Sequence, residues 1–426
     1  MTVRRVALIT VHASPLALLG SRKAGGMNVY IRELARELGE RGIEVDIYTR
    51  RTSDDQLEID YSIGKNVRVI HIVSGGVRTL GPDDIYTHLS EFAAGMIAFA
   101  TRAAINYDII YSHYWLSGWV ANKLREVWGT PFVHMFHTLG QMKNRIQATG
   151  PSILPDTRIT VETRVMDWAD AVIAATPAEH AQLLWLYRGD RRKIHIVSPG
   201  VNLERFRPVA PDVARQQLGI DEQTKLLLFV GRIEPLKAVD TVLHALAILK
   251  ETDQPEFDDI RFVVIGGSPD DPHDAETQRL IALTEELDLS QHVQFLGARA
   301  QESLPLYYGA ATSLIVPSDY ESFGMVALEA MASGTPVIAS EVGGLAFLVR
   351  DGETGYLVPS RDPHQLAERI LRVVSNTDQY SRMRAAAANL ALHYAWSVIA
   401  DQLLDIFSSV LQRYRANRHK SWVHRR

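Results

Sequence analysis

Short apolar runs alternate with helix-like segments along nearly the whole chain, and the alternation occurs in two successive series. Parallel strands need crossover connections, usually helices, so this pattern predicts parallel sheets with helices on both faces. The first series contains the strand-like runs 6–11, 45–48, 67–72, 108–111, 132–136 and 171–174, and a helix over 27–40. The second contains the strand-like runs 225–230, 261–265, 293–295, 314–316 and 337–339, and helices over 241–250 and 279–287. The sequence therefore predicts an α/β protein with two Rossmann-like domains.

The expected domain boundaries follow from where the first series ends. The turn-rich segment 198–202 separates the two series, and 426 residues are enough for two domains. We therefore expect an N-terminal domain over 1–198 and a C-terminal domain over 199–395. Residues 396–413 have helical apolar periodicity and predict one long helix, and residues 414–426 form a basic tail that contains a single tryptophan.

The composition is that of a soluble globular chain, and it excludes several classes of function. The net charge of −5 leaves no basic excess with which to bind nucleic acid. The absence of cysteine excludes disulfides, thiolate metal ligands and cysteine nucleophiles, and it fits a cytoplasmic protein. The apolar run 6–11 leads into a glycine-rich turn, so we expect a buried strand there and not a signal peptide. No apolar run reaches the ~18 residues that a membrane span needs.

The segment from Glu321 to Glu329 carries the strongest functional signal. It follows the apolar run 311–316 and precedes a Gly-Thr-Pro stop, which predicts a strand, a short loop and a helix that opens near Gly324. The first turn of such a helix directs unpaired N–H groups toward a bound anion, which suits a phosphate. Glu321 and Glu329 would then accept hydrogen bonds from sugar hydroxyls on either side of a diphosphate. The alternative is that both are ordinary surface acids.

Three further groups follow predicted strands, where open α/β sheets bind their ligands. Gly25 and Gly26 would let the backbone approach a phosphate at the start of the first helix. Arg232 and Lys237 would hold a diphosphate leaving group, and His137 stands at the end of a strand. Each group alone also fits an ordinary turn, a solvated basic pair or a structural histidine.

The absence of two motifs indicates which kinds of phosphate-binding site we do not expect in this chain. No Asp-x-Asp motif follows a strand, and no Walker-type Gly-Lys-Ser/Thr is present. We therefore expect no metal site and no cofactor, so side chains and helix ends would have to stabilise the leaving group. Catalysis would then depend on positioning and on stabilisation of charge.

Taken together, these motifs resemble the retaining GT-B glycosyltransferases of family 4, over nearly the whole chain. The resemblance implies two Rossmann-like domains facing each other across a cleft, and a last helix that crosses back to the first domain. It implies transfer of a sugar from a nucleotide diphosphate, usually UDP, with no covalent nucleophile. It also implies roles for the residues quoted above. Arg232, Lys237, His137 and Glu321 would be catalytic, and Gly25, Gly26, Arg299, Gly324, Met325, Val326 and Glu329 would bind the donor.

The segments 12–15, 24–30, 112–118 and 137–139 resemble one subgroup more closely. It contains the mycothiol-pathway transferases that act on inositol phosphate and the bacterial sucrose-phosphate synthases, which use phosphorylated acceptors. This resemblance implies that the acceptor pocket is lined by Asn28, Tyr114, Thr138 and Arg158, with Arg158 on the phosphate. The chain departs from the subgroup at two places. It has no lysine between Lys65 and Lys123, where the subgroup has a phosphate-binding lysine, and Ala238 stands where the family usually has glycine. We expect the Ala238 methyl group only to tighten the start of the next helix.

The sequence leaves the acceptor open between a sugar, a sugar phosphate and a lipid-linked or polysaccharide acceptor. The basic tail would suit peripheral contact with an anionic membrane, although a solvated tail fits the same residues. Two other classes remain as alternatives: a nucleotide-sugar epimerase of the same fold, and a non-catalytic module that binds nucleotide sugars.

Overall fold

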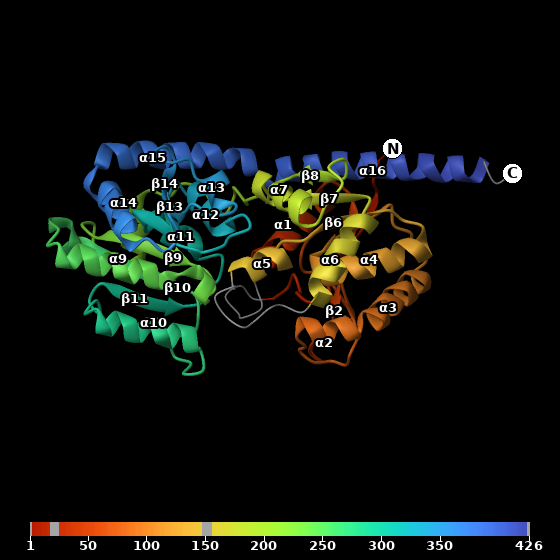
Figure 1. Cartoon of the computed structure of the whole chain (residues 1–426), viewed down its shortest axis with the longest axis horizontal. Helices are drawn as coiled ribbons and strands as arrows, with labels where there is room; N and C mark the ends of the chain where they lie inside the picture. Colours follow the sequence, from red (N-terminus) through yellow and green to blue (C-terminus); the bar gives the residue numbers. More distant parts are fainter. Residues whose placement is uncertain (1, 18–24, 147–155, 424–426) are drawn as a thin grey trace. The chain divides into compact units, whose positions relative to one another are not determined.

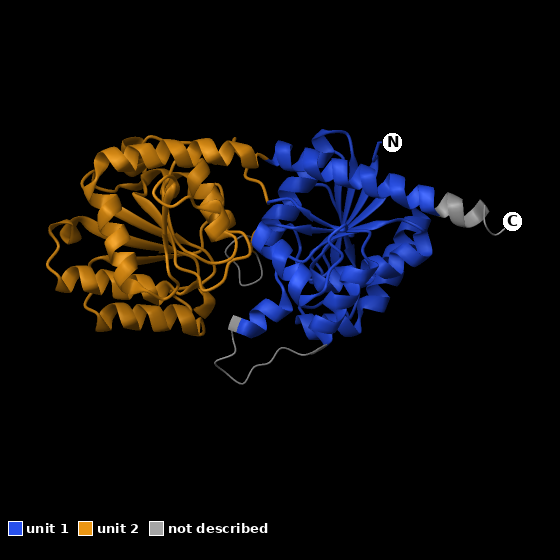
Figure 2. Cartoon of the chain, turned by 45° about the horizontal axis from the view of Figure 1, so that its top comes forward, with its two compact units in different colours: residues 1–17, 27–198, 396–426 blue, residues 18–26, 199–395 orange. Residues whose placement is uncertain are grey.

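The computed structural model describes residues 2–17, 25–146 and 156–423 of the 426-residue chain. The chain divides into two compact units. Unit 1 contains residues 1–17, 27–198 and 396–426, and unit 2 contains residues 18–26 and 199–395 (Figure 2). Each sheet lies in the middle of its unit with helices around it.

The described part of unit 1 contains an eight-stranded sheet of order β3-β4-β2-β1-β5-β6-β7-β8. Figure 1 labels β2, β6, β7 and β8 of this sheet. Its strands are β1 (Arg5–Ile9), β2 (Glu44–Arg50), β3 (Ile59–Asp60), β4 (Val67–Ile72), β5 (Ile109–His113), β6 (Phe132–Met135), β7 (Ala171–Ala174) and β8 (Ile194–Ile196). Its helices are α1 (Gly26–Glu40), α2 (Pro82–Thr87), α3 (Leu89–Arg102), α4 (Tyr114–Trp128), α5 (Gly140–Ile146), α6 (Asp156–Trp168), α7 (Pro177–Leu186) and α16 (Trp396–Val423). Buried apolar side chains of the strands and of α3 and α4 form its core.

The described part of unit 2 contains a six-stranded sheet of order β11-β10-β9-β12-β13-β14. Its strands are β9 (Lys225–Val230), β10 (Ile260–Ile265), β11 (Val293–Gly297), β12 (Ser313–Val316), β13 (Val337–Ser340) and β14 (Gly355–Val358). Its α-helices are α8 (Pro211–Leu218), α9 (Val239–Glu251), α10 (Ala275–Glu286), α11 (Leu304–Ala310), α12 (Met325–Ala332), α13 (Leu345–Leu348), α14 (Pro363–Ser375) and α15 (Thr377–Ala391). Three 3₁₀ turns are η1 (Pro235–Lys237), η2 (Pro255–Asp259) and η3 (Leu392–Tyr394).

The described strands pair in parallel, as the sequence predicts, with one exception at a sheet edge. The two-residue strand β3 pairs antiparallel with β4 at the edge of the unit 1 sheet. Apolar runs did not indicate β3 because Ile59 and Asp60 are both only partly buried. The sequence analysis also missed β8 and β14, which are short strands at sheet edges.

Local signals in the sequence explain where many helices begin and end. Thr176 caps α7, since its side chain accepts a hydrogen bond from the backbone N–H of Glu179, and Pro177 occupies the first turn. Asp362 caps α14 in the same way. Gly129 ends α4 in the left-handed conformation, with a φ of 62°, which glycine adopts without steric strain.

The last helix is longer than the sequence predicted. We expected a helix over 396–413, but α16 continues to Val423. No glycine or proline interrupts residues 414–423. The first two of these residues, Tyr414 and Arg415, contact other parts of unit 1. The Arg415 guanidinium forms an ion pair with Asp108 at 3.2 Å, and the Arg125 guanidinium lies 5.5 Å from the centre of the Tyr414 ring. The side chains of the basic tail from 418 onward, Trp422 included, lie outside the described residues.

The order of the strands marks one ligand-binding edge in each unit. In unit 1 the chain order reverses between β1 and β5, and in unit 2 it reverses between β9 and β12. Loops that leave the carboxyl ends of two such strands run in opposite directions, which opens a crevice for ligands. Among the described residues no helix is both long and apolar enough to cross a membrane.

Candidate active site

The reversal point of unit 2 brings together two of the predicted catalytic residues. Lys237 ends η1 in the loop after β9, and Glu321 lies in the loop after β12. Lys237 Nζ and the Glu321 carboxylate are 2.5 Å apart, and the two side chains are 21% and 17% exposed. An ammonium group is therefore held at the edge of the sheet where a ligand of this fold would lie.

The backbone of Ala238, directly after Lys237, differs from what the sequence predicted. Its φ of 51° places it in the left-handed region, as the N-cap of α9. A residue with a Cβ atom costs about 1–2 kcal/mol in that region, whereas glycine adopts it readily. The methyl group therefore strains this backbone position and does not simply tighten the start of the helix.

Arg361 is a residue of this site that the sequence analysis missed. Its guanidinium donates to Asp319 at 2.7 Å, to Asp240 at 2.9 Å and to the carbonyl oxygen of Pro235 at 3.0 Å. One side chain thus joins the loop after β12, the start of α9 and η1. No sequence pattern pointed to it, because it comes from the loop between β14 and α14, far along the chain.

Arg232 lies in the same loop as Lys237 but is more open to solvent. Its side chain is 45% exposed and forms an ion pair with Glu234 at 2.7 Å. The glycine pair of the first loop clusters with unit 2. A methyl group built on Gly25 would lie 3.7 Å from Nε of Arg232, and one on Gly26 would lie 3.2 Å from the sulfur of Met325.

The predicted phosphate-binding helix is α12, and its N-cap is Gly324. Gly324 has a φ of 99°, and a Cβ atom there would meet the Leu345 side chain at 2.6 Å. Glycine is therefore needed at this position for both its conformation and its size. Met325 and Val326 form the first turn, whose N–H groups have no acceptor within the helix.

Of the other predicted donor-site residues, Glu329 is buried and Arg299 is exposed. Glu329 is buried on α12 and accepts hydrogen bonds from Gln301 at 3.0 Å and from the Tyr308 hydroxyl at 3.1 Å. Its carboxylate is thus held in place by two partners that the sequence analysis did not identify. Arg299 follows β11, is exposed, and donates to the carbonyl oxygen of Ala298.

In unit 1, two predicted site residues have strained backbones at the carboxyl ends of neighbouring strands. Tyr114 follows β5 with a φ of 72°, and His137 comes just after β6 with a φ of 62°. Bulky residues rarely adopt this conformation, and such strain clusters at functional sites. His12, in the loop after β1, packs its ring 4.2 Å from that of Tyr114, which places both at the reversal point of unit 1.

His137 is partly buried and lies beside two fully buried imidazoles, His113 and His134. Its Nε2 lies 2.9 Å from Nδ1 of His113, and the edge of the Tyr30 ring packs against both. Burial, together with the neighbouring His12, lowers the pKa of His137 to about 3. Burial also lowers the pKa of His113 and of His134 well below the ordinary value. All three rings are therefore neutral at pH 7.

The predicted acceptor residues Tyr114, Thr138 and Arg158 lie together. Arg158 donates to the main-chain oxygen of Thr138 at 2.8 Å and to its hydroxyl at 3.1 Å, and its guanidinium lies 4.9 Å from the centre of the Tyr114 ring. Its Nε donates to the buried carboxylate of Glu162 at 2.7 Å. The guanidinium charge is thus balanced by Glu162, which the sequence analysis did not identify.

Asn28 is connected to this group through its neighbours. It lies on α1, and its amide donates to the carbonyl oxygen of Ser14 at 2.7 Å. Ser14 is two residues from His12, which packs on Tyr114. Asn28 is therefore in the same region of unit 1, although its amide is directed at the loop after β1.

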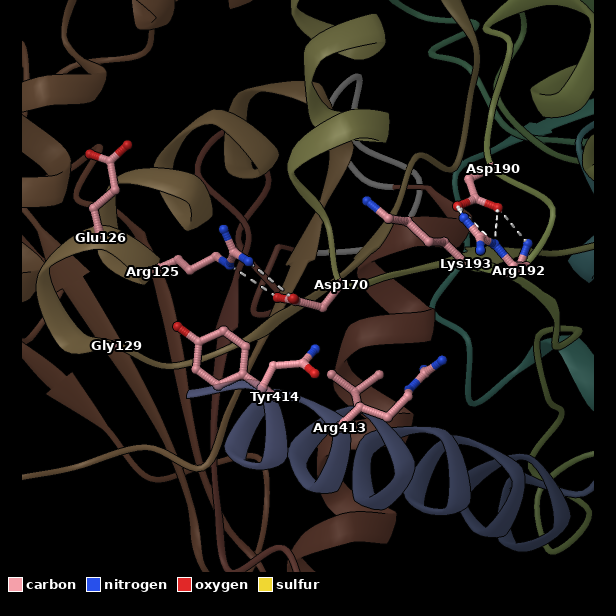
Figure 3. Close-up of a pocket in the computed structure, with 11 residues that line it drawn as sticks. Arg125, Glu126, Gly129, Asp170, Asp190, Arg192, Lys193, Arg413 and Tyr414 are labelled. Atoms are coloured by element: carbon pink, nitrogen blue, oxygen red, sulfur yellow. Dashed lines mark hydrogen bonds and ion pairs between the residues drawn. The ribbon is translucent and has the colours of Figure 1, made fainter. Parts of the chain in front are cut away.

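A cavity of about 790 Å³ in unit 1 is large enough for a ligand but lies at the other edge of the sheet. Its lining residues come just before β6, β7 and β8 and from α16 (Figure 3). Arg125 pairs with Asp170 and Arg192 pairs with Asp190 inside it. Open α/β sheets bind ligands at the carboxyl ends of their strands, so this cavity is not the active site.

Comparison with known proteins decides the family. The models described as "Glycosyltransferase Family 4" and "Glycosyl transferases group 1" match residues 24–205 and 212–390. A D-inositol 3-phosphate glycosyltransferase of Corynebacterium diphtheriae is 39% identical over 410 residues, which are 96% of this chain and 95% of the relative. The chain belongs to the family 4 glycosyltransferases. It is a retaining glycosyltransferase that uses a nucleotide-sugar donor.

Two further comparisons agree with this family 4 assignment. The D-inositol 3-phosphate glycosyltransferase of Mycolicibacterium smegmatis is 40% identical over 416 residues, which are 97% of this chain and 93% of the relative. The structure of a sucrose-phosphate synthase from Thermosynechococcus elongatus matches with a TM-score of 0.86 and 34% identity, covering 96% of this chain and all of that one. The predicted GT-B fold is therefore confirmed, and so is the resemblance to this subgroup.

Proposed function

We propose that this family 4 enzyme transfers a sugar from UDP-glucose or UDP-N-acetylglucosamine to a hydroxyl group of a small phosphorylated polyol or sugar, without a metal ion. The main support is the Lys237–Glu321 pair at the reversal point of unit 2. A donor diphosphate lying there would accept hydrogen bonds from Lys237, from Arg232 and from the first turn of α12. These groups stabilise the negative charge that develops as the diphosphate leaves.

The acceptor class is supported by the relatives and by the cluster around Arg158. Proteins that share about 40% of this sequence are named D-inositol 3-phosphate glycosyltransferases. Nη1 of Arg158 makes no hydrogen bond to a described residue, so it remains available to a phosphate oxygen. The lysine that the subgroup places before its second helix is missing, and Pro82 begins α2 instead. Arg78, the nearest cation in sequence, donates to the carbonyl oxygen of Gly75.

Product analysis tests both parts of the proposal. The full chain would be incubated with UDP-glucose, UDP-N-acetylglucosamine or GDP-mannose, each with inositol phosphates, hexose phosphates and the same acceptors without phosphate. EDTA would be present in a parallel series. We expect an α-linked product from one UDP-sugar and one phosphorylated acceptor, undiminished by EDTA. Transfer only to unphosphorylated acceptors would overturn the acceptor class, and a preference for GDP-mannose would overturn the donor.

A membrane-surface enzyme that builds a lipid-linked or polysaccharide glycan is the second candidate, because the sequence after Asn417 is basic and contains Trp422. Anionic lipids attract such segments by about 1 kcal/mol per basic residue. Co-sedimentation with phosphatidylglycerol vesicles would compare the full chain with a chain stopped after Asn417, which keeps Tyr414 and Arg415. Equal binding of both chains would remove this candidate.

A further inference from the structure

The pair of histidines at the ends of β5 and β6 has only one arrangement of protons that avoids a buried, unpaired N–H group. His113 is fully buried, and its Nδ1 faces Nε2 of His137 at 2.9 Å. Nε2 of His113 is also buried and has no hydrogen-bond partner. A neutral imidazole carries one proton, so one of the two facing nitrogens must donate and the other must accept.

Two assignments are possible, and they differ at the buried Nε2 of His113. If His137 donated, His113 would carry its proton on Nε2, which would be a buried N–H group with no acceptor. If His113 donates from Nδ1, its Nε2 is a bare lone pair. Buried backbone N–H groups without an acceptor are rarer in proteins than under-satisfied carbonyl oxygens, and we extend this ranking to imidazole nitrogens. The second assignment is therefore favoured, and it leaves the His137 proton on Nδ1.

The neighbouring His134 has the same arrangement. Its Nδ1 lies 2.8 Å from the Ser112 hydroxyl, and that hydroxyl is also 3.2 Å from the carbonyl oxygen of Val133. Both contacts are hydrogen bonds only if His134 donates from Nδ1 and Ser112 donates to Val133. Nε2 of His134 is then bare, and it too is buried without a partner.

We propose that His113 is a positioning residue that holds His137 as its Nδ1–H tautomer, so that His137 offers an N–H donor to a hydroxyl oxygen of the bound sugar. Nδ1 of His137 makes no hydrogen bond to a described residue and is not among the buried unpaired atoms. It is therefore open to a ligand. The identity of that ligand as a sugar rests on the proposed function, whereas the tautomer does not.

This assignment limits what His137 can do in the reaction. Its Nδ1 already carries a proton, and its Nε2 is occupied by the hydrogen bond from His113. Neither nitrogen can take a proton from the acceptor hydroxyl without breaking that arrangement. His137 therefore binds and orients the sugar, and it does not act as a general base.

Nitrogen-15 spectroscopy of the full chain with labelled histidines tests the tautomer at pH 7. Long-range proton–nitrogen correlations distinguish a protonated ring nitrogen from a bare one. We expect Nδ1 of both His113 and His137 to be protonated and both Nε2 atoms to be bare. Protonation of Nε2 in His137 would overturn the proposal, whether or not the chain binds a UDP-sugar.

Substitutions at His113 then test the positioning role. His113→Phe keeps a buried ring but removes the donor, so His137 should populate both tautomers. Loss of one oriented hydrogen bond should weaken donor binding about 3- to 10-fold. His113→Asn keeps an N–H donor near the Nδ1 position and should restore both the tautomer and the affinity. His195→Phe, the same change in β8, is the control. A His113→Phe chain with the unchanged His137 tautomer would show that His113 has no positioning role.

Discussion

Lys237 carries much of the proposed chemistry, and among the described residues its ammonium group pairs with Glu321. The pair lies at the reversal point of unit 2, and Arg361 braces both of the loops that supply it. When a donor diphosphate binds, the Lys237 ammonium group would move from the Glu321 carboxylate to a phosphate oxygen. Its charge would then be balanced both before and after binding. Because Lys237 would donate to the leaving group, the rate of sugar transfer should depend on this residue.

Replacing Lys237 with alanine should lower turnover by about 10²-fold or more, because one charge-stabilising donor would be lost from the leaving group. Lys237→Arg should recover part of the activity. Initial rates at saturating UDP-sugar would measure both effects. Lys250→Ala is a matched control, since Lys250 pairs with Asp288 in the same unit, away from the site. A near-normal rate for Lys237→Ala would mean that other groups stabilise the diphosphate.

Glu329 should act mainly on donor binding. Its carboxylate is fixed by Gln301 and Tyr308, and by resemblance it holds the ribose hydroxyls, far from the reacting carbon. Glu329→Gln keeps the size and removes the charge, so we expect about 10- to 100-fold weaker UDP binding in calorimetry, with kcat changed much less. Tyr308→Phe should have a smaller effect, because the carboxylate remains. A fall in kcat at unchanged UDP affinity would contradict this role.

At the scale of elements, α16 packs aromatic side chains and its first turn against the rest of unit 1. Trp396 at its start packs against the ring of Tyr30, and Phe407 packs against Tyr111, which lies in the middle of the sheet in β5. Arg41 on α1 donates to the carbonyl oxygen of Ser397 at 2.7 Å. The helix thus supports β5, which ends at His113 directly before Tyr114, and α1, which carries Asn28.

Phe407→Ala should therefore destabilise unit 1 by about 3–5 kcal/mol, because the phenyl ring is fully buried and its removal leaves a cavity. Urea unfolding followed by near-ultraviolet circular dichroism would measure the change. Ser409→Ala, on the exposed face of the same helix, should change the stability by no more than about 0.5 kcal/mol. Equal stabilities of the two variants would mean that α16 contributes little to unit 1.

At the scale of the whole molecule, stability should fall as the pH falls through 6.5. The pKa of His137 is lowered to about 3, and the pKa of His113 and of His134 is lowered as well, so the folded chain stays neutral at sites where the unfolded chain takes up protons. Each such proton lowers stability by about 1.4 kcal/mol per pH unit. Glu179 opposes this trend. Its pKa is raised to about 7, so the folded chain binds that proton more tightly between 4.5 and 7.

The pKa of His71 and of His195 is also lowered, so five histidines outweigh one glutamate and the unfolding temperature should drop between pH 7.5 and pH 5. Calorimetric scans at several pH values would measure the slope. His134→Asn keeps a donor beside Ser112 but cannot titrate, so it should flatten the slope by about one proton. A temperature that stays constant over this range would mean that the buried imidazoles can take up protons in the folded state.

Local sequence patterns determined the parts of this protein that depend on neighbouring residues. Runs of buried apolar residues predicted β7 and β9 with correct bounds, because burial on both faces produces a near-continuous apolar strand. The loop sequence placed the start of a helix near Gly324, and Gly324 is the N-cap of α12, left-handed and crowded. Motif resemblance supplied the family, which the comparisons confirm.

Only the tertiary structure decided which side chains meet. Arg361 and Tyr308 support predicted site residues of unit 2, and Glu162 and His113 support those of unit 1, each from a distant part of the chain. No periodicity or spacing in one sequence reports such contacts. The left-handed backbones of Tyr114, His137 and Ala238 were also invisible, since none is the glycine that signals this conformation. A local pattern reports what one element prefers, whereas a binding site is made where several elements end together.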